Sequence, residues 1–210
     1  MTVMSRRALM KLGLASTGAL TLGARAGFGH ENPMPDALRQ ALERAPFAPV
    51  LGNPEGDVTL TEFFDYNCPF CRTSVPVMKR VIDGDKKLRV VFREWPIFGE
   101  GSIFATKASL ATLKQGKYWA FHERLMAIKG KANEQSVMEV VRAVGLDETR
   151  LKRDMESDEV LGHIDHSMQL GEHLGLAGTP SFIAGHEGLF GKQEFSAMTG
   201  LIAKARTDLL

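Results

Sequence analysis

Two strand-like segments flank a helical one after residue 56. Residues 57–66 and 88–95 are rich in valine and phenylalanine, and their apolar content is typical of mostly buried strands. Between them, apolar residues recur at helical spacing over residues 74–82. This order predicts a strand–helix–strand unit. Its apolar positions are Val58, Leu60, Phe63 and Phe64 in the first strand, and Val75, Met78, Val81 and Ile82 in the helix.

The hydrophobic pattern becomes helical throughout residues 101–175. We predict four or five helices here, one of them capped by Asp147. Strand character returns at residues 181–184, a turn follows at residues 185–188, and a last helix covers about residues 194–207. Because strands lie on both sides of the helical block, we predict an α/β domain with a helical insertion, in which the first and last segments share one sheet.

The segment before the first strand is punctuated by prolines. Residues 30–56 contain five of them, and a short helical pattern lies between them at residues 36–44. Asp36 is a plausible N-cap for this helix. We expect the rest of the segment to be an extended lead-in.

Composition narrows the range of functions. The chain has 210 residues, with 26 basic and 25 acidic side chains and a net charge of +1. This length fits one domain with a large insertion. The even charge balance provides no positive field to attract nucleic acid, so we expect no nucleic-acid partner.

The first 26 residues have the order of a bacterial export signal. Basic residues Arg6, Arg7 and Lys11 precede a mildly apolar stretch, residues 12–24, and small residues end the segment at Ala26. The paired arginines resemble a twin-arginine signal; an ordinary secretory signal and a retained anchor are the alternatives. We expect cleavage near Ala26 and a periplasmic location, where a cysteine pair can work as a disulfide.

The two cysteines of the chain, Cys68 and Cys71, follow the first predicted strand directly. Pro69 suits the first position of a helix, which places Cys68 at the helix N-terminus, where free N–H groups and the helix dipole stabilise a thiolate. Cys71, one turn deeper, can close a disulfide or resolve a mixed one. A metal site, which usually needs four ligands, and a purely structural disulfide are the alternatives. We favour redox exchange.

Two segments of the chain resemble one known family. Residues 62–72, Glu-Phe-Phe-Asp-Tyr-Asn-Cys-Pro-Phe-Cys-Arg, are similar to the active-site segment of the DsbA-like thioredoxin-fold proteins, which are exported bacterial thiol–disulfide oxidoreductases. Residues 178–183, Gly-Thr-Pro-Ser-Phe-Ile, are similar to the second signature of that family, and residues 49–54 match its lead-in. The resemblance covers about residues 48–208. It implies a thioredoxin fold with a helical domain inserted between its two halves.

The resemblance also implies roles for the residues around the cysteines. Cys68 would be the exposed nucleophile and Cys71 its buried partner, with Pro69 and Phe70 tuning the thiolate between them. Glu62 matches a buried acidic residue that exchanges a proton with Cys71 through water. A strand residue facing solvent at a sheet edge is the alternative for Glu62.

The second signature would complete the redox site. Pro180 would follow a cis peptide bond, and Thr179 and Pro180 would lie against the disulfide, with the backbone of Thr179 available to pair with an extended substrate. For Asp65 we expect a loop or capping role instead of a catalytic one, and for Phe63 and Phe64 a place in the core.

Two further groups of residues have a structural and a functional interpretation. His163, His166 and His173 share one helix face, where a polar stripe is favoured over a metal site. Four methionines at helical core spacing indicate packing, with an adaptable substrate groove as the alternative. These methionines are Met126, Met138, Met155 and Met168.

From these signals we predict an enzyme that exchanges disulfides with unfolded or partly folded exported proteins, most simply as a disulfide-forming oxidase. The exchange needs no bound cofactor or metal, but needs a redox partner protein, for which a membrane-bound reoxidase is one option. An isomerase or reductase of the same fold, a copper or zinc chaperone that uses the cysteine pair, and a non-catalytic adaptor are the alternatives. The expected parts are a signal peptide (residues 1–26), a lead-in (27–56), a thioredoxin-like domain (57–98 and 177–208) and an inserted helical domain (99–176).

Overall fold

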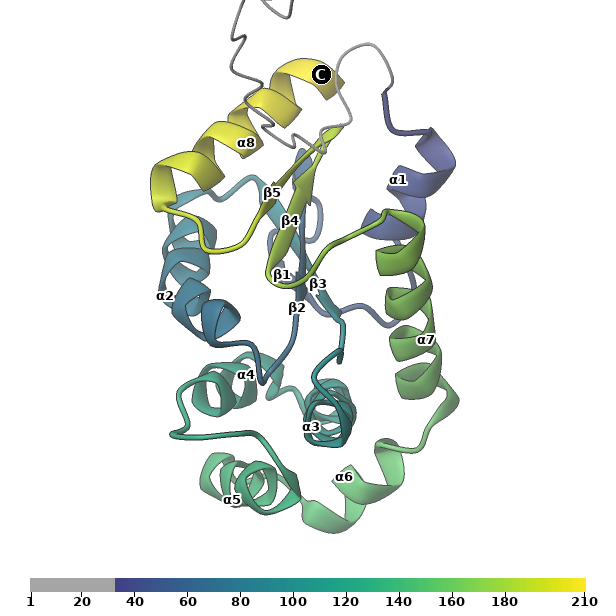
Figure 1. Ribbon diagram of the computed structural model, residues 1–210, viewed down its shortest axis with the longest axis vertical. Helices are drawn as coiled ribbons and strands as arrows, with labels where there is room; N and C mark the ends of the chain where they lie inside the picture. Colours follow the sequence, from purple (N-terminus) through teal and green to yellow (C-terminus); the bar gives the residue numbers. More distant parts are fainter. Residues whose placement is uncertain (1–32) are drawn as a thin grey trace, which may run out of the picture.

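A mixed sheet of five strands, in the order β1-β3-β2-β4-β5, forms the centre of the protein (Figure 1). The computed structural model describes residues 33–210, so the predicted signal peptide lies outside the described residues. Neighbouring strands β2 and β3 are parallel, and the other pairs are antiparallel. The strands are β1 (Val50–Gly52), β2 (Val58–Phe64), β3 (Leu88–Glu94), β4 (Ser181–Ala184) and β5 (Glu187–Phe190).

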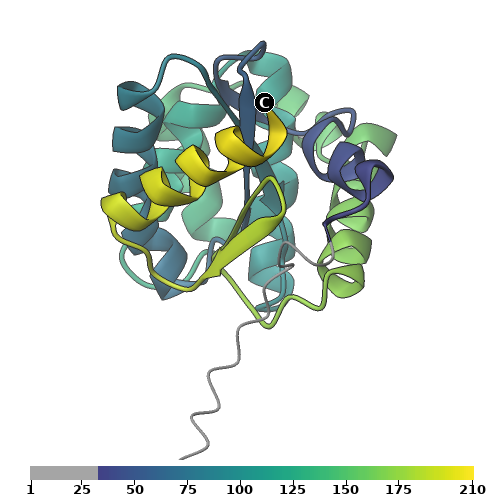
Figure 2. The same ribbon diagram turned by 90° about the horizontal axis from the view of Figure 1, so that it is seen from above.

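Helices cover both faces of this sheet, as Figures 1 and 2 show together. Helices α2 (Pro69–Gly84) and α8 (Phe195–Leu209) pack on one face, and α1 (Asp36–Glu43) and α7 (Asp158–His173) on the other. The central strand β2 is buried along its whole length. Successive side chains of a strand point to opposite faces. Phe63 therefore packs under α1 and α7, whereas Leu60 and Phe64 face α2 and α8.

The helices between β3 and β4 form the predicted insertion. They are α3 (Glu100–Ala111), the 3₁₀ helix η1 (Thr112–Gln115), α4 (Tyr118–Met126), α5 (Glu134–Val144), α6 (Glu148–Asp154) and α7. Strand β4 returns next to β2, where Leu60 lies opposite Ala184. The prediction that the first and last segments share a sheet, and with it the thioredoxin-type fold class, is confirmed.

Helix α1 is attached to the sheet by two arginines of β3. Arg93, which is fully buried, donates from Nε and Nη2 to the carbonyl of Leu42 at 3.2 and 2.9 Å. Its Nη2 also donates to the carbonyl of Ala41, and Arg89 donates to that of Glu43. The last carbonyls of a helix have no partner within it and carry the negative end of its dipole. The arginines therefore satisfy the C-terminal end of α1.

Several local predictions were wrong. Strands β1 and β5 were not predicted, because β1 has three residues and β5 contains Gly188 within the glycine-rich stretch that indicates a turn. Pro35, not Asp36, is the N-cap of α1, since the Asp36 carboxylate instead accepts from Arg39 Nη2 at 2.8 Å. Met168 is exposed on the outer face of α7, whereas the other three methionines are in the core.

Among the described residues, no helix has the length and apolar content needed to cross a membrane.

Candidate active site

Cys68 is the N-cap of α2, and Pro69 is the first residue of the helix, as predicted. The backbone N–H of Cys71 donates to Cys68 Sγ at 3.4 Å. The pKa of Cys68 falls from 9.0 to about 6, chiefly because the Cys71 thiol donates a hydrogen bond to it. Burial opposes this shift, and the backbone N–H groups of Cys71 and Phe70 add to it. Cys68 is thus a thiolate at neutral pH.

Cys71 has the opposite character. Burial is the main reason that its pKa lies far above 9.0, and its hydrogen bond to Cys68 raises it further. Both cysteines are free thiols in this structure. The pair therefore combines one stabilised thiolate with one thiol that holds its proton, an asymmetry that suits an attacking and leaving sulfur next to a resolving one.

The expectation that Cys68 is exposed is wrong for this dithiol form. Cys68 is 1% exposed, as is Cys71. The physical reason is the segment before β4: the carbonyl oxygen of Thr179 lies 3.2 Å from Cys68 Sγ, and the Thr179–Pro180 peptide bond is cis, as predicted. In contrast, the Phe70 side chain is 57% exposed beside the pair.

Glu62 lies on the central strand β2, on the sheet face that packs against α2 and α8, and is 4% exposed. The solvent-facing edge position is therefore wrong, because β3 and β4 flank β2 on both sides. Burial, and then the charge of Cys68, raise the pKa of Glu62 from 4.5 to about 8. This carboxyl is thus protonated at neutral pH, and it is close enough to Cys68 for the charge of that thiolate to raise its pKa.

Asp65 organises the loop that carries Cys68, in line with its predicted loop role. It is fully buried, and its carboxylate accepts hydrogen bonds from four groups. Two of them, the backbone N–H groups of Ile97 and Phe98, belong to the segment between β3 and α3 and lie at 2.8 and 3.0 Å. The others are the backbone N–H of Asn67 at 2.6 Å and the hydroxyl of Ser102 at 2.7 Å. The carboxylate therefore joins the ends of two parallel strands.

Two residues without a predicted role, Asn67 and Arg72, connect the cysteine segment to the loop between α4 and α5. The Asn67 side chain exchanges two hydrogen bonds with the backbone of Ala132, at 2.7 and 3.1 Å. Arg72 Nη1 donates to the carbonyls of Ile128 and Gly130 at 3.1 and 2.6 Å. Both residues lie inside the motif of residues 62–72. Asn67 lies between β2 and α2, where a polar residue is itself a signal for such a role, whereas Arg72 lies in the first turn of α2.

A network of buried polar side chains joins the end of β3 to helices of the insertion. Glu94 and His163 are fully buried side chains 2.9 Å apart, and Tyr118 donates to the other Glu94 oxygen at 2.5 Å. The hydroxyl of Tyr66 lies 2.5 Å from Ser109 Oγ and 3.1 Å from His122 Nδ1. The three helical histidines therefore do not form one polar stripe, because His163 points inward to β3. In the sequence, the inward orientation of His163 is indicated only by its position on the inner face of α7.

The described part of the chain contains no group of three or more histidine, cysteine, aspartate or glutamate side chains placed to hold a metal ion. Of the predicted site residues, the structure brings Cys68, Cys71, Thr179 and Pro180 together, with Glu62 nearby on β2. The catalytic roles of these residues stay predictions.

Comparison with known proteins agrees with this geometry. Residues 59–203 match the DSBA-like thioredoxin domain. The crystal structure of a thioredoxin-like oxidoreductase from Silicibacter pomeroyi is 51% identical, with a TM-score of 0.78 over 80% of this chain and 98% of that one. The thiol-disulfide exchange protein alpha-DsbA2 from Wolbachia pipientis is 26% identical, with a TM-score of 0.75 over 80% and 92%.

Curated relatives fall into two groups. The probable disulfide bond formation protein D of Bacillus cereus is 26% identical over 73% of this chain and 76% of its own length. A Na⁺/H⁺ antiporter of Salinispora tropica is 23% identical over 74% of this chain, which spans only 24% of that protein's length. Because the domain match covers most of the chain, the protein belongs to the DSBA-like thioredoxin domain family of thiol–disulfide oxidoreductases.

Proposed function

We propose that the protein forms disulfides in exported proteins, by exchange through Cys68 and Cys71. The observation that supports oxidation over reduction is the asymmetry of the pair. A pKa of about 6 at Cys68 stabilises the reduced form, and a dithiol that is stabilised when reduced makes its disulfide a strong oxidant.

In the proposed reaction, a substrate thiolate attacks Cys68 Sγ of the Cys68–Cys71 disulfide. The S–S bond breaks, a mixed disulfide forms, and Cys71 leaves and takes up a proton. A second substrate thiolate then attacks the substrate sulfur of the mixed disulfide, and Cys68 leaves as a thiolate. The substrate loses two electrons and the cysteine pair gains them, so a redox partner protein must reoxidise the pair.

Glu62 is the proposed source of the proton for Cys71. It is protonated at neutral pH, and Cys71 binds a proton far more strongly than an ordinary thiol. The proton passes through water. Thr179 is the proposed backbone contact for an extended substrate, because its carbonyl already lies against Cys68 Sγ.

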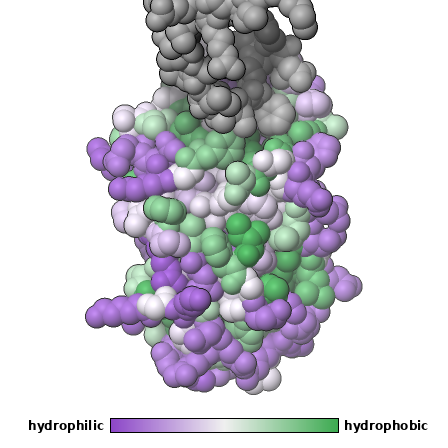
Figure 3. Space-filling view, in the orientation of Figure 1, coloured by the Kyte–Doolittle hydropathy of each residue, from purple (hydrophilic) through white to green (hydrophobic). Residues whose placement is uncertain are grey.

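Unfolded substrates fit the surface around the pair. The exposed side chains of Phe70, Ile97 and Phe98 belong to segments that Asp65 and the cysteines hold together. On the face of the molecule seen in Figure 1, hydrophobic residues gather in the middle and hydrophilic residues lie along the rim (Figure 3). A sequence-tolerant apolar surface suits chains that have not yet buried their own apolar residues. The export-signal pattern at the N-terminus supports a periplasmic site of action.

The deciding experiment is the equilibrium reduction potential of the pair in glutathione buffers. We expect a value near −120 mV, as for strongly oxidising pairs, whereas about −270 mV would make the protein a reductase. The Cys68→Ser variant should lose the oxidation of a reduced peptide, and Cys71→Ser should accumulate a mixed disulfide. Activity that survives Cys68→Ser would contradict exchange at this site.

A further inference from the structure

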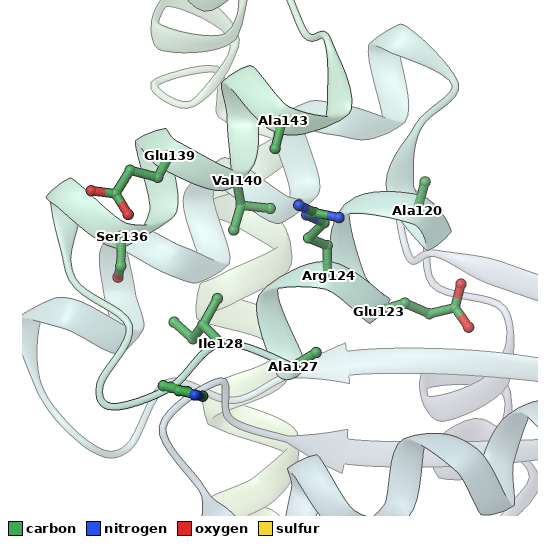
Figure 4. A pocket seen from close by; sticks show the side chains of 10 residues that line it. Ala120, Glu123, Arg124, Ala127, Ile128, Ser136, Glu139, Val140 and Ala143 are labelled. Carbon is green, nitrogen blue, oxygen red and sulfur yellow. The ribbon is translucent and has the colours of Figure 1, made fainter.

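A groove of about 720 Å³ lies between α4 and α5 (Figure 4). Its walls combine aliphatic and charged side chains. Of the aliphatic ones, Ala127 and Ile128 come from the end of α4 and the loop after it, and Val140 and Ala143 from α5. This groove is separate from the cysteine pair and has no part in the exchange steps described above.

Arg124 is one of two basic side chains that line the groove; the other, Lys129, lies in the loop after α4. The Arg124 side chain extends across it toward Val140 and Ala143, while the carboxylates of Glu123 and Glu139 point away to opposite sides (Figure 4). Glu139 accepts a hydrogen bond from Gln135 at 3.1 Å. In the region of the chain that the structure covers, Arg124 has no ion pair and its guanidinium makes no hydrogen bond. A guanidinium in this setting is suited to bind a carboxylate with two parallel hydrogen bonds.

The groove begins beside the helix that carries the cysteines. Ile128 lines it, and the Ile128 carbonyl accepts a hydrogen bond from Arg72 Nη1 at 3.1 Å. Arg72 lies one helical turn after Cys68, whose carbonyl it binds through its backbone N–H at 3.2 Å. The Arg72 side chain thus spans from Cys68 to Ile128, and Arg124 precedes Ile128 by about one helical turn. An arginine side chain and one helical turn together correspond to about four to six residues of a polypeptide extended at roughly 3.3 Å per residue.

We propose that this groove is a second contact for the substrate polypeptide, and that it selects an acidic residue next to an aliphatic one. The aliphatic side chain packs against Ile128 and Val140, and the carboxylate binds the guanidinium of Arg124. This inference rests on the proposed function, because the bound segment is the one whose cysteine reacts at Cys68. Substrates with a carboxylate about four to six residues from the reacting cysteine are then favoured over neutral ones.

The test compares two single-cysteine peptides that differ only five residues from the cysteine, where one carries Leu-Glu-Glu and the other Leu-Gln-Gln. The rate constant for their reaction with the oxidised protein is measured at low ionic strength. An exposed ion pair of this kind should favour the acidic peptide by about two- to fivefold, and added salt should reduce that preference. Arg124→Ala should lower the rate constant for the acidic peptide to that for the glutamine peptide. Arg124→Glu should reverse the preference.

A matched control is Lys152→Ala, which removes one exposed positive charge from α6, outside the groove. This variant should retain the preference of the natural protein. Equal rates for both peptides with the natural protein, or a preference that survives Arg124→Ala, would overturn the assignment of the groove. Failure of both peptides to react would instead contradict the proposed exchange at Cys68.

Discussion

At the scale of single residues, the two cysteines owe their difference to position. Cys68 sits at the start of α2, where the Cys71 thiol and two backbone N–H groups point at its sulfur, whereas Cys71 lies one turn inside the protein. The spacing of the motif and the proline at the first helical position were enough to predict this difference. The burial of Cys68 was not predictable from the motif, because it is caused by Thr179, which is distant in the sequence.

The pKa of Cys68 gives a direct prediction. The rate of alkylation of the reduced protein by iodoacetamide should rise with pH to a midpoint near pH 6, because only the thiolate reacts. The Cys71→Ala variant loses the largest cause of the lowered pKa, so its midpoint should move toward that of a free thiol. An unchanged midpoint in Cys71→Ala would assign the shift to the backbone N–H groups instead.

Glu62 should make stability fall as pH rises. Its pKa is about 8 in the folded protein against 4.5 for an ordinary glutamate, so between these values the folded state holds a proton that the unfolded state has released. The free energy of unfolding then decreases from about pH 4.5 to pH 8 and levels off above. In the oxidised protein, urea unfolding at pH 5, 6.5 and 8 should show Glu62→Gln becoming progressively more stable than the natural protein. Glu134→Gln, at an exposed position, is the control and should show no such trend.

At the scale of elements, the hydrophobic pattern predicted the long and amphipathic pieces and missed the short ones. The segment that becomes β4 was predicted with the bounds that the structure shows, and Asp147 caps α6 as expected, by accepting from the backbone N–H of Arg150 at 2.9 Å. Strands β1 and β5 lie at the two edges of the sheet, where a few residues suffice because only one neighbour has to be paired. Three or four residues carry too little alternation to be recognised from sequence.

The Asp65 carboxylate should be a main determinant of how the cysteine loop is attached. Replacing it by alanine removes the acceptor of the partly buried N–H groups of Ile97 and Phe98, and a fully buried group left unpaired costs about 1–3 kcal/mol. We expect Asp65→Ala to lower the free energy of unfolding by about 2–4 kcal/mol in urea titrations. Asp158→Ala, at an exposed position in the first turn of α7, should cost about 1 kcal/mol or less. A similar effect of the two substitutions would show that water replaces the carboxylate.

At the scale of the whole molecule, a buried contact between Glu94 and His163 joins the insertion to the sheet. Glu94 ends β3 and His163 lies in the middle of α7, and nothing in the sequence pairs a carboxyl group at a strand end with a histidine 69 positions later. Fold class and insertion followed from the order of elements. The contacts between the insertion and the sheet depend on which polar side chains meet in the interior, and a period of hydrophobic residues carries no information about that.

Removing the His163 side chain should lower the free energy of unfolding. In His163→Leu the carboxyl group of Glu94 keeps its hydrogen bond from Tyr118 but loses the ring nitrogen that lies 2.9 Å from its other oxygen, and a buried polar group left without a partner costs about 1–3 kcal/mol. The double variant Glu94→Gln/His163→Leu should lose less than the sum of the single variants, because the glutamine oxygen still accepts from Tyr118. Urea unfolding of the four proteins gives the coupling energy, and additive losses would mean that the two side chains do not interact. Alkylation of Cys68 should keep its midpoint throughout.

Because of the long insertion, the cysteine pair and the segment that covers it are synthesised at different times. Cys68 and Thr179 are 111 residues apart in sequence, and the entropy of closing a loop makes such a contact form late in folding. The unit β2–α2–β3 contains both cysteines and is made from neighbouring residues. A newly made chain therefore presents its cysteine pair before the segment that covers it has been synthesised. Because the sequence has two cysteines, this early exposure can produce only one internal disulfide, the one between Cys68 and Cys71.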